Sequence, residues 1–290
     1  MWVGGCLALD DGRHGGGEGS FRTPWLPCFS SFEAGSKWEW AIFFKVGINS
    51  KNIISAETIS LLQELANEVQ LKDAITKYFD GDVINQTENR AVLHTALRAK
   101  ENASVKVDGV NVMPEIYSVK NKIKNFSNEI ISGQRKGFSG KPFTDVVNIG
   151  IGGSDLGPMM INQALKDFHE GPEIFYVSNI DPTNMSDVLE KCNPLKTLFI
   201  ITSKSFGTLE TLENAKVAKN WLSVANKSIN DSMVAITSSI DKAIKWGFNN
   251  QNIFYFSENI GGRYSLWSSV AMPIMLSIGE NNFKDFLYGA

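Results

Sequence analysis

Cysteine and histidine are both scarce in this 290-residue chain, which has three residues of each. They are Cys6, Cys28, Cys192, His14, His94 and His169. The cysteines are too few and too scattered for a disulfide framework or a zinc site, and three histidines exclude a histidine-rich metal centre. The low cysteine content is typical of the reducing cytoplasm, which is the location that we predict.

The sequence also lacks a strong excess of either charge and any long apolar run. Lys and Arg total 28 against 31 for Asp and Glu, a formal charge of −3, which excludes a surface built to neutralise nucleic-acid phosphates. No apolar stretch reaches the ~18 residues of a membrane-spanning helix. With 43% apolar residues, the chain is able to bury a sizeable core. We therefore expect an α/β or α+β protein with no nucleic-acid or membrane partner.

Residues 1–45 differ in composition from the rest of the chain. They hold eight of the 25 glycines and four of the seven tryptophans, and the glycine triplet at 15–17 is typical of flexible coil. We predict an unmatched, disordered leader, and a Trp-rich interaction arm is the alternative. No basic stretch precedes the short apolar run at the start, so a secretory signal is not expected.

Two helices are expected before the main alternation of elements. Ser55 is able to cap the first, in which apolar residues recur at helical spacing over 59–69. The second is expected over residues 90–98, where Arg90 and His94 are four residues apart and would share a helical face.

From residue 145 onward, short apolar runs alternate with helix-length segments. The runs are Asp145–Ile151, Glu173–Ser178, Thr197–Thr202, Met233–Thr237 and Asn252–Phe256. The segments between them are Gly157–Phe168, Thr183–Lys191, Thr208–Ala225 and Asp241–Gly247. Continuously apolar strands are typical of a parallel sheet that is buried on both faces. The pattern predicts an α/β fold, a doubly wound five-stranded parallel sheet with flanking helices.

The loop after the first predicted strand is rich in glycine, with Gly150, Gly152 and Gly153 before Ser154. Ligands of open parallel sheets bind beyond the carboxyl ends of the strands, where glycine lets the backbone approach an anion at a helix N-terminus. The third glycine of a dinucleotide fingerprint is replaced by Asp155, and a carboxylate facing a pyrophosphate disfavours NAD binding. A glycine-rich turn that binds nothing is the alternative.

The loop after the third predicted strand gathers three hydroxyls and an ammonium group before a helix. They belong to Ser203, Lys204, Ser205 and Thr208. Such a set suits a phosphate monoester, because hydroxyl and amide donors satisfy its oxygens and the ammonium group offsets its charge. The alternative is a Ser- or Thr-capped helix with a solvated lysine. Because both loops leave the same edge of the sheet, we favour a phosphate site.

The segment after the fifth predicted strand places Gly261 and Gly262 directly before Arg263. The two glycines expose the backbone beside the guanidinium group, and we expect Arg263 to stabilise a developing oxyanion. The alternative is a structural arginine that pairs with a carboxylate or with a helix C-terminus.

Three of these motifs together resemble the glucose-6-phosphate isomerase (phosphoglucose isomerase) family. They are Gly150–Pro158 (GIGGSDLGP), Ser203–Thr211 (SKSFGTLET) and Gly261–Trp267 (GGRYSLW). Asn85–Arg98 and Val177–Asp181 look like the family as well. The resemblance covers residues 46–290 in unbroken order and leaves out the leader. It implies a sugar-isomerase (SIS) fold with a flavodoxin-like sheet.

The resemblance implies an enzyme that interconverts glucose 6-phosphate and fructose 6-phosphate through a cis-enediolate, in glycolysis and gluconeogenesis, with no cofactor and no metal. It assigns the phosphate and sugar contacts to Gly153, Ser154, Ser203, Lys204, Ser205 and Thr208. Arg263 matches the family's catalytic arginine beside C1 and C2 of the sugar, where it steadies the enediolate.

The resemblance also bears on what lies outside these motifs. The family's glutamate base and its ring-opening histidine and lysine are expected in segments after Ala290, so we expect this chain to be inactive alone. Family members form homodimers, which we expect of the full-length protein. The expected domains are a helical part at 46–105, the SIS domain at 106–260 and the start of a second domain at 261–290. In the last of these we expect exposed apolar side chains, such as Leu266, Trp267, Ile274 and Leu276.

Two other functions stay open on the sequence alone. One is a non-catalytic SIS domain that binds a sugar phosphate. The other is a nucleotide-binding protein with a doubly wound sheet, which Asp155 disfavours.

Overall fold

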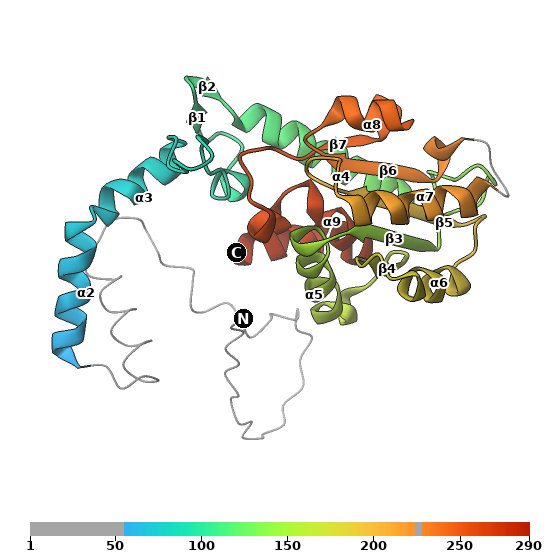
Figure 1. The fold of residues 1–290 in the computed structure, drawn as a ribbon, viewed down its shortest axis with the longest axis horizontal. Helices are drawn as coiled ribbons and strands as arrows, with labels where there is room; N and C mark the ends of the chain where they lie inside the picture. Colours follow the sequence, from blue (N-terminus) through green and yellow to red (C-terminus); the bar gives the residue numbers. More distant parts are fainter. Residues whose placement is uncertain (1–54, 224–227) are drawn as a thin grey trace, which may run out of the picture. The chain divides into compact units, whose positions relative to one another are not determined.

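A computed structural model of the protein describes residues 55–223 and 228–290 (Figure 1). The predicted leader at 1–45 and the last two residues of the predicted helix Thr208–Ala225 lie outside the described residues. Contacts divide the chain into two units, 1–65 and 66–290, and each is described by itself.

The first predicted helix is confirmed as α2 (Ala56–Glu68). Its first turn is capped by Ser55, whose Oγ accepts a hydrogen bond from the Thr58 amide at 3.1 Å. A serine hydroxyl at this position satisfies one of the amides that a helix start leaves without a partner.

The second unit is built on a five-stranded sheet with the order β4-β3-β5-β6-β7. The strands are β3 (Asp145–Gly150), β4 (Glu173–Val177), β5 (Thr197–Thr202), β6 (Met233–Thr237) and β7 (Ile253–Tyr255). All four neighbouring pairs are parallel. Because β3 lies between β4 and β5, the chain winds first to one side and then to the other, the flavodoxin-like order. The predicted fold class is confirmed.

Helices cover both faces of this sheet (Figure 1). One face carries α6 (Pro182–Lys191), α7 (Leu209–Ser223) and α8 (Ile240–Trp246), and the other carries α4 (Met113–Ile131), α5 (Leu156–Ala164) and α9 (Met272–Gly289). Successive strand residues point to opposite faces, so Val146 packs toward α4 and α9 while Val147 packs toward α7. Both side chains are 0% exposed, which explains why the strands are apolar at consecutive positions.

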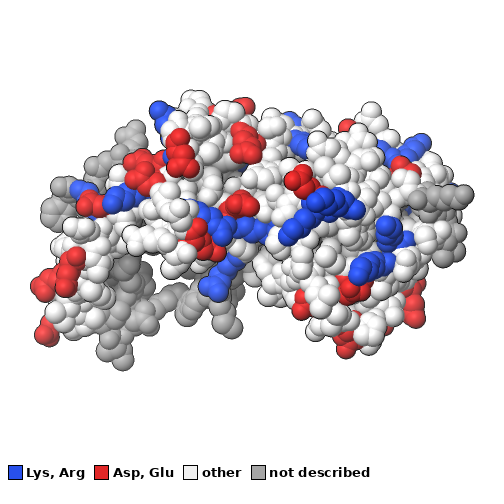
Figure 2. Space-filling model, turned by 45° about the horizontal axis from the view of Figure 1, so that its top comes forward, with Lys and Arg blue, Asp and Glu red and all other residues white. Residues whose placement is uncertain are grey.

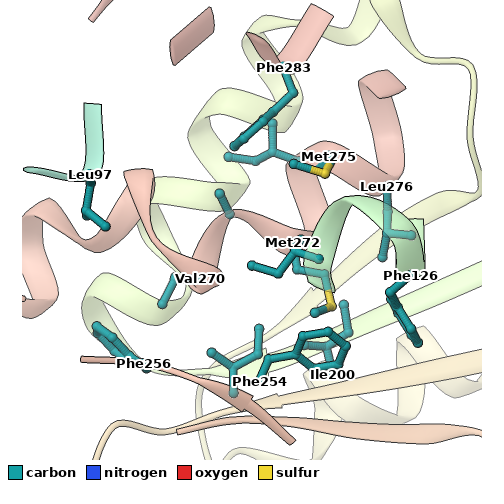
Figure 3. Close-up of a cluster of buried hydrophobic side chains, with 14 of the residues drawn as sticks. Leu97, Phe126, Ile200, Phe254, Phe256, Val270, Met272, Met275, Leu276 and Phe283 are labelled. Carbon is teal, nitrogen blue, oxygen red and sulfur yellow. The ribbon is translucent and has the colours of Figure 1, made fainter. Parts of the chain in front are cut away.

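The core on the α4 and α9 side joins residues from distant parts of the unit (Figure 3). Phe126 of α4 meets Phe254 of β7 edge to face, with ring centroids 5.1 Å apart. Ile274 and Leu276 of α9 are both 0% exposed, so the expectation that they lie at an exposed apolar edge is wrong. The reason is that α9 packs against α4 and buries them.

The prediction of a helix over residues 90–98 is wrong for most of its length. Only η1 (Ala96–Arg98) is helical, as a short 3-10 turn. The Arg90 amide donates to Asn85 O at 3.1 Å and the Leu93 amide to Asn259 O at 3.0 Å. From Arg90 to Leu93 the backbone therefore bonds to other segments, and bonds along the segment begin only with the Leu97 amide, which donates to Leu93 O at 3.2 Å. Burial alternates over the first part, with Ala91 and Leu93 inside.

Several elements had no counterpart in the sequence analysis. They are α3 (Leu71–Asp80), the hairpin of β1 (Lys106–Val107) and β2 (Val110–Asn111), α4 and α9. Further 3-10 turns are η2 (Gly152–Ser154), η3 (Lys166–Phe168), η4 (Ile229–Asp231), η5 (Asn250–Asn252), η6 (Gly262–Trp267) and η7 (Ser269–Ala271). The predicted domain boundaries at 105/106 and 260/261 both fall inside the second unit and stay predictions.

Two surface properties concern possible partners. Figure 2 shows acidic and basic side chains interspersed on the face in view, with no broad area of one sign. Within the described part of the chain, no helix has both the length and the apolar character that crossing a membrane requires.

The fold predicts a large difference between two isoleucine truncations. Ile200 lies at the centre of the sheet and is 0% exposed, whereas Ile244 of α8 is 46% exposed. We expect Ile200→Ala to lower the free energy of unfolding by about 2–5 kcal/mol, because it removes buried methyl groups and leaves a cavity. Ile244→Ala is expected to change it by less than about 1 kcal/mol. Urea unfolding measures both, and similar losses for the two variants would contradict the assigned core.

Candidate active site

Two of the predicted ligand loops leave the sheet at the point where its winding reverses. They follow β3 and β5, which are adjacent and parallel. In open sheets of this kind, ligands bind in the crevice beyond the carboxyl ends of such strands. The third predicted segment, at 261–267, folds as η6 and packs against η2 of the first loop.

A buried asparagine fixes the first loop. Asn148 of β3 is 0% exposed, and its Nδ2 donates to Ser154 O at 3.0 Å. Its Oδ1 accepts a hydrogen bond from Thr202 Oγ1 at 3.1 Å. The Asn148 side chain therefore fixes the position of the loop after β3 relative to the end of β5. The sequence analysis missed Asn148, although an amide within an otherwise apolar strand was the available signal.

The first loop and the third segment meet backbone to backbone. A Cβ placed on Gly153 would lie 2.0 Å from the carbonyl oxygen of Gly262, so only glycine fits at this approach. Ser265 Oγ donates to Gly262 O at 2.7 Å and lies 3.5 Å from Gly153 O. The structure thus brings Gly153 close to the residue that precedes Arg263, whose side chain is exposed.

The turn at 203–208 is held by a buried aromatic side chain. Phe206 has φ +44°, a left-handed conformation that is strained for this residue, and its amide donates to Ser203 O at 3.1 Å. Its ring is 3% exposed and meets the Phe248 ring edge to face. Ser205 is consequently exposed, and the hydroxyls of Ser203 and Thr208 lie 3.2 Å apart at the start of α7.

Lys204 joins the second loop to the backbone directly before the third segment. Its Nζ donates to the carbonyl oxygens of Glu258 at 2.8 Å and Ile260 at 2.7 Å, and lies 5.6 Å from the centroid of the Phe256 ring. Burial lowers the pKa of Lys204, and the nearby charge of Arg90 lowers it further. An ammonium group has three donors, so one remains beyond these two bonds.

A pocket of about 360 Å³ opens beside Lys204. Its lining includes Asn85, Glu88, Arg90, His94, Lys204 and Glu258. Arg90 and His94 thus share a pocket wall, although the residues between them are not an α-helix. Among the residues that the structure describes, no three His, Cys, Asp or Glu side chains are grouped so that they could hold a metal ion.

Asp155 lies elsewhere than the sequence argument placed it. The residue is 3% exposed, and its Oδ1 has no hydrogen-bond partner among the described residues. Burial raises the pKa of this carboxyl, an effect that a hydrogen bond with Ser178 opposes. The carboxyl is therefore buried in the protein rather than exposed on the surface of the glycine-rich loop.

The three loops therefore form one connected structure. Gly153, Ser154 and Arg263 come together through the Gly153–Gly262 approach, and Lys204 reaches the same segment from the second loop. Ser205 and Thr208 lie on the turn that carries Lys204.

Sequence comparisons found a family model and relatives that match most of this chain. The family model described as phosphoglucose isomerase matches residues 49–290, after the predicted leader. The glucose-6-phosphate isomerase of Christiangramia forsetii is 47% identical over 243 residues, covering 83% of this chain and 45% of that protein. That of Wigglesworthia glossinidia brevipalpis is 49% identical over 244 residues, covering 83% and 44%. The chain spans about half the length of these relatives.

A solved structure agrees with these matches. The crystal structure of a glucose-6-phosphate isomerase from Chlamydia trachomatis superimposes with a TM-score of 0.71 at 28% identity. The superposition covers 82% of this chain and 46% of that one.

The Gly153–Gly262 approach predicts unequal effects of two alanine substitutions. Gly153→Ala forces its new methyl group into the Gly262 carbonyl, and we expect a loss of about 1–3 kcal/mol in the free energy of unfolding. Gly262→Ala is the matched control, because a Cβ there meets nothing within 4 Å. Its expected effect is within about 0.5 kcal/mol. Chemical denaturation compares the two, and equal stability of both variants would show that the loops are not in contact.

Proposed function

The chain belongs to the phosphoglucose isomerase family, and we propose that its described residues form the substrate-phosphate side of a glucose-6-phosphate isomerase site. The proposed reaction interconverts glucose 6-phosphate and fructose 6-phosphate through a cis-enediolate, with no cofactor. The observation that carries the proposal is the joining of the loops after β3 and β5 to the Arg263 segment.

The phosphate group is proposed to bind at the turn before α7. The hydroxyls of Ser203 and Thr208 lie 3.2 Å apart at the start of this helix, and the exposed Ser205 lies on the same turn, where peptide dipoles favour an anion. The remaining donor of Lys204 is proposed to contact the same phosphate. Gly153 and Ser154 would line the sugar-phosphate side. A phosphate held away from the reacting carbons supplies binding energy that orients C1 and C2 for proton transfer.

Arg263 is proposed to act on the developing charge. During transfer of a proton between C2 and C1, negative charge accumulates on the enediolate oxygens, and a preorganised guanidinium group lowers the energy of that state. The Gly153–Gly262 approach supports this role, because it sets the segment that carries Arg263 directly against the loop proposed to bind the sugar phosphate.

The acid–base groups are proposed to come from sequence that follows these motifs in the longer family members. The resemblance assigns a glutamate base and ring-opening histidine and lysine to those segments, and the curated relatives are about twice as long as this chain. Homodimer formation by the full-length protein and a cytoplasmic location stay predictions.

The phosphate proposal predicts a selective effect of Lys204→Ala. Loss of a charge-assisted contact is expected to weaken glucose 6-phosphate binding by about 1.5–3 kcal/mol, roughly 10- to 150-fold. Binding of unphosphorylated glucose is expected to change little. Titration calorimetry for the phosphate and ligand-observed NMR for glucose measure these changes.

Lys216→Ala is the control, since Lys216 is an exposed lysine of α7 that pairs with Glu213. Equal weakening of both ligands by Lys204→Ala would assign Lys204 to holding the 258–260 backbone alone. In that case Lys204 is not a phosphate contact.

In this proposal residues 1–290 carry the phosphate contacts and Arg263, and the acid–base groups lie in other segments. It therefore predicts that residues 1–290 bind substrate without ordinary turnover. Purified residues 1–290 are expected to bind fructose 6-phosphate but to turn over far more slowly than the ~1–1000 per second of ordinary enzymes, because proton transfer at carbon needs a positioned base. A dehydrogenase-coupled assay measures the rate. Fusion to the following segments of a relative is expected to restore it. Ordinary turnover by residues 1–290 alone would overturn the division, and inactivity of the fusion would favour a sugar-phosphate-binding domain without catalysis.

A further inference from the structure

The segment 90–98 contacts the Arg263-bearing segment at successive positions. Arg90 Nη1 donates to Glu258 O at 2.8 Å, and the Leu93 amide donates to Asn259 O at 3.0 Å. The Gly261 amide in turn donates to His94 Nε2 at 3.0 Å. These bonds join residues more than 160 positions apart in the sequence, and they fix the backbone immediately before Arg263.

Two ring contacts extend this attachment past Arg263. The His94 and Tyr264 rings meet edge to face with centroids 5.6 Å apart. The guanidinium carbon of Arg98 lies 5.7 Å from the centroid of the Trp267 ring. His94 therefore contacts the chain on both sides of Arg263, through Gly261 before it and Tyr264 after it.

Arg90 is itself held in place. Its Nη2 lies 3.0 Å from Glu88 Oε1, and Asn85 Nδ2 donates to the other carboxylate oxygen at 2.8 Å. The planar guanidinium group thus bonds a carboxylate and a carbonyl at once, which a lysine ammonium does with much less directional control. This arrangement orients Arg90 toward Glu258 before any ligand binds.

We propose that Arg90 and His94 are positioning residues for Arg263. They hold segment 258–264 so that the backbone of Arg263 stays against Gly153. The proposal rests on the proposed function only for what Arg263 does, since the attachment itself is a property of this chain.

The role of His94 depends on its protonation state. To accept from the Gly261 amide, Nε2 must carry no proton. Burial lowers the pKa of His94, and the nearby positive charges of Lys204 and Arg98 lower it further. Arg90, Glu88 and Glu258 line the same pocket, and Tyr264 faces the ring.

The direction of the pH effect follows. Because the folded-state pKa of His94 lies below its ordinary value of 6.5, the unfolded chain takes up a proton first as pH falls. The contribution of the His94–Gly261 bond is complete above about 6.5 and is lost as pH falls through the folded-state pKa.

The experiment compares backbone order in the 290-residue chain by ¹⁵N relaxation. In the unmodified protein the Arg263 amide is expected to have an order parameter near about 0.85, and in His94→Phe below about 0.6. Phenylalanine keeps the ring contact with Tyr264 but removes the acceptor. His94→Gln supplies a neutral acceptor and is expected to restore the order, and His169→Phe, an exposed histidine, is the control.

Arg90→Met provides a second variant that leaves His94 intact, and we expect it to lower the same order parameter. The pH readout is independent: order at Arg263 is expected to fall on acidification in the unmodified protein but not in His94→Gln. An order parameter at Arg263 that stays near about 0.85 in both His94→Phe and Arg90→Met would overturn the proposal. So would a failure of His94→Gln to restore it.

Calorimetry with glucose 6-phosphate on the same samples separates this proposal from the proposed function. If the unmodified chain does not bind the sugar phosphate, the proposed function fails while the relaxation data still decide the positioning of Arg263. If it binds but the order parameters do not respond, only the positioning proposal fails.

Discussion

The approach of the Gly153 backbone to the Gly262 carbonyl is the contact on which the rest of the candidate site depends. It brings a loop that follows β3 against a segment more than 100 residues later, and so places Arg263 beside the switch point of the sheet. A side chain at position 153 would separate the two backbones. The buried Asn148 stabilises this contact, because its hydrogen bonds to Ser154 and Thr202 hold the loop that contains Gly153 against the end of β5.

Two cations, Lys204 and Arg90, and two acidic residues, Glu88 and Glu258, line the pocket beside the segment that precedes Arg263. Lys204 and Arg90 both donate to the carbonyl oxygen of Glu258. Burial lowers the pKa of Lys204, and the nearby positive charge of Arg90 lowers it further. Glu88 offsets part of this repulsion through its ion pair with Arg90. A bound phosphate would reduce the repulsion further, since its charge is opposite to both. Lys204 and Arg90 therefore both hold the segment that precedes Arg263, and Lys204 is in addition proposed to contact the phosphate.

Most of the sheet could be predicted from local pattern. The observed β5 and β6 have the predicted bounds, β3 and β4 end one residue earlier than predicted, and β7 is one residue shorter at each end. The agreement is close because continuous apolar runs between turn residues depend on local sequence alone. The segment at 90–98 shows where this reasoning fails. Its apolar residues fit a helical period, yet the amides of Arg90 and Leu93 bond to the carbonyl oxygens of Asn85 and Asn259. Asn259 follows Leu93 by 166 residues, and the sequence near Leu93 does not indicate so distant a partner.

The sequence by itself determined the doubly wound fold and the three loops that carry the candidate residues, because each depends on contiguous residues whose pattern is typical of one backbone geometry. The motifs in these loops also carried the resemblance to the family. Tertiary structure alone decided what those residues contact. It buried Asp155 and gave Lys204 two carbonyl partners. It also brought His94 into contact with Gly261 and Tyr264, which lie on either side of Arg263 in the chain. These outcomes depend on hydrogen bonds and close packing between segments that are distant in the sequence. Such contacts form, and contribute to the free energy of folding, only once the chain has folded.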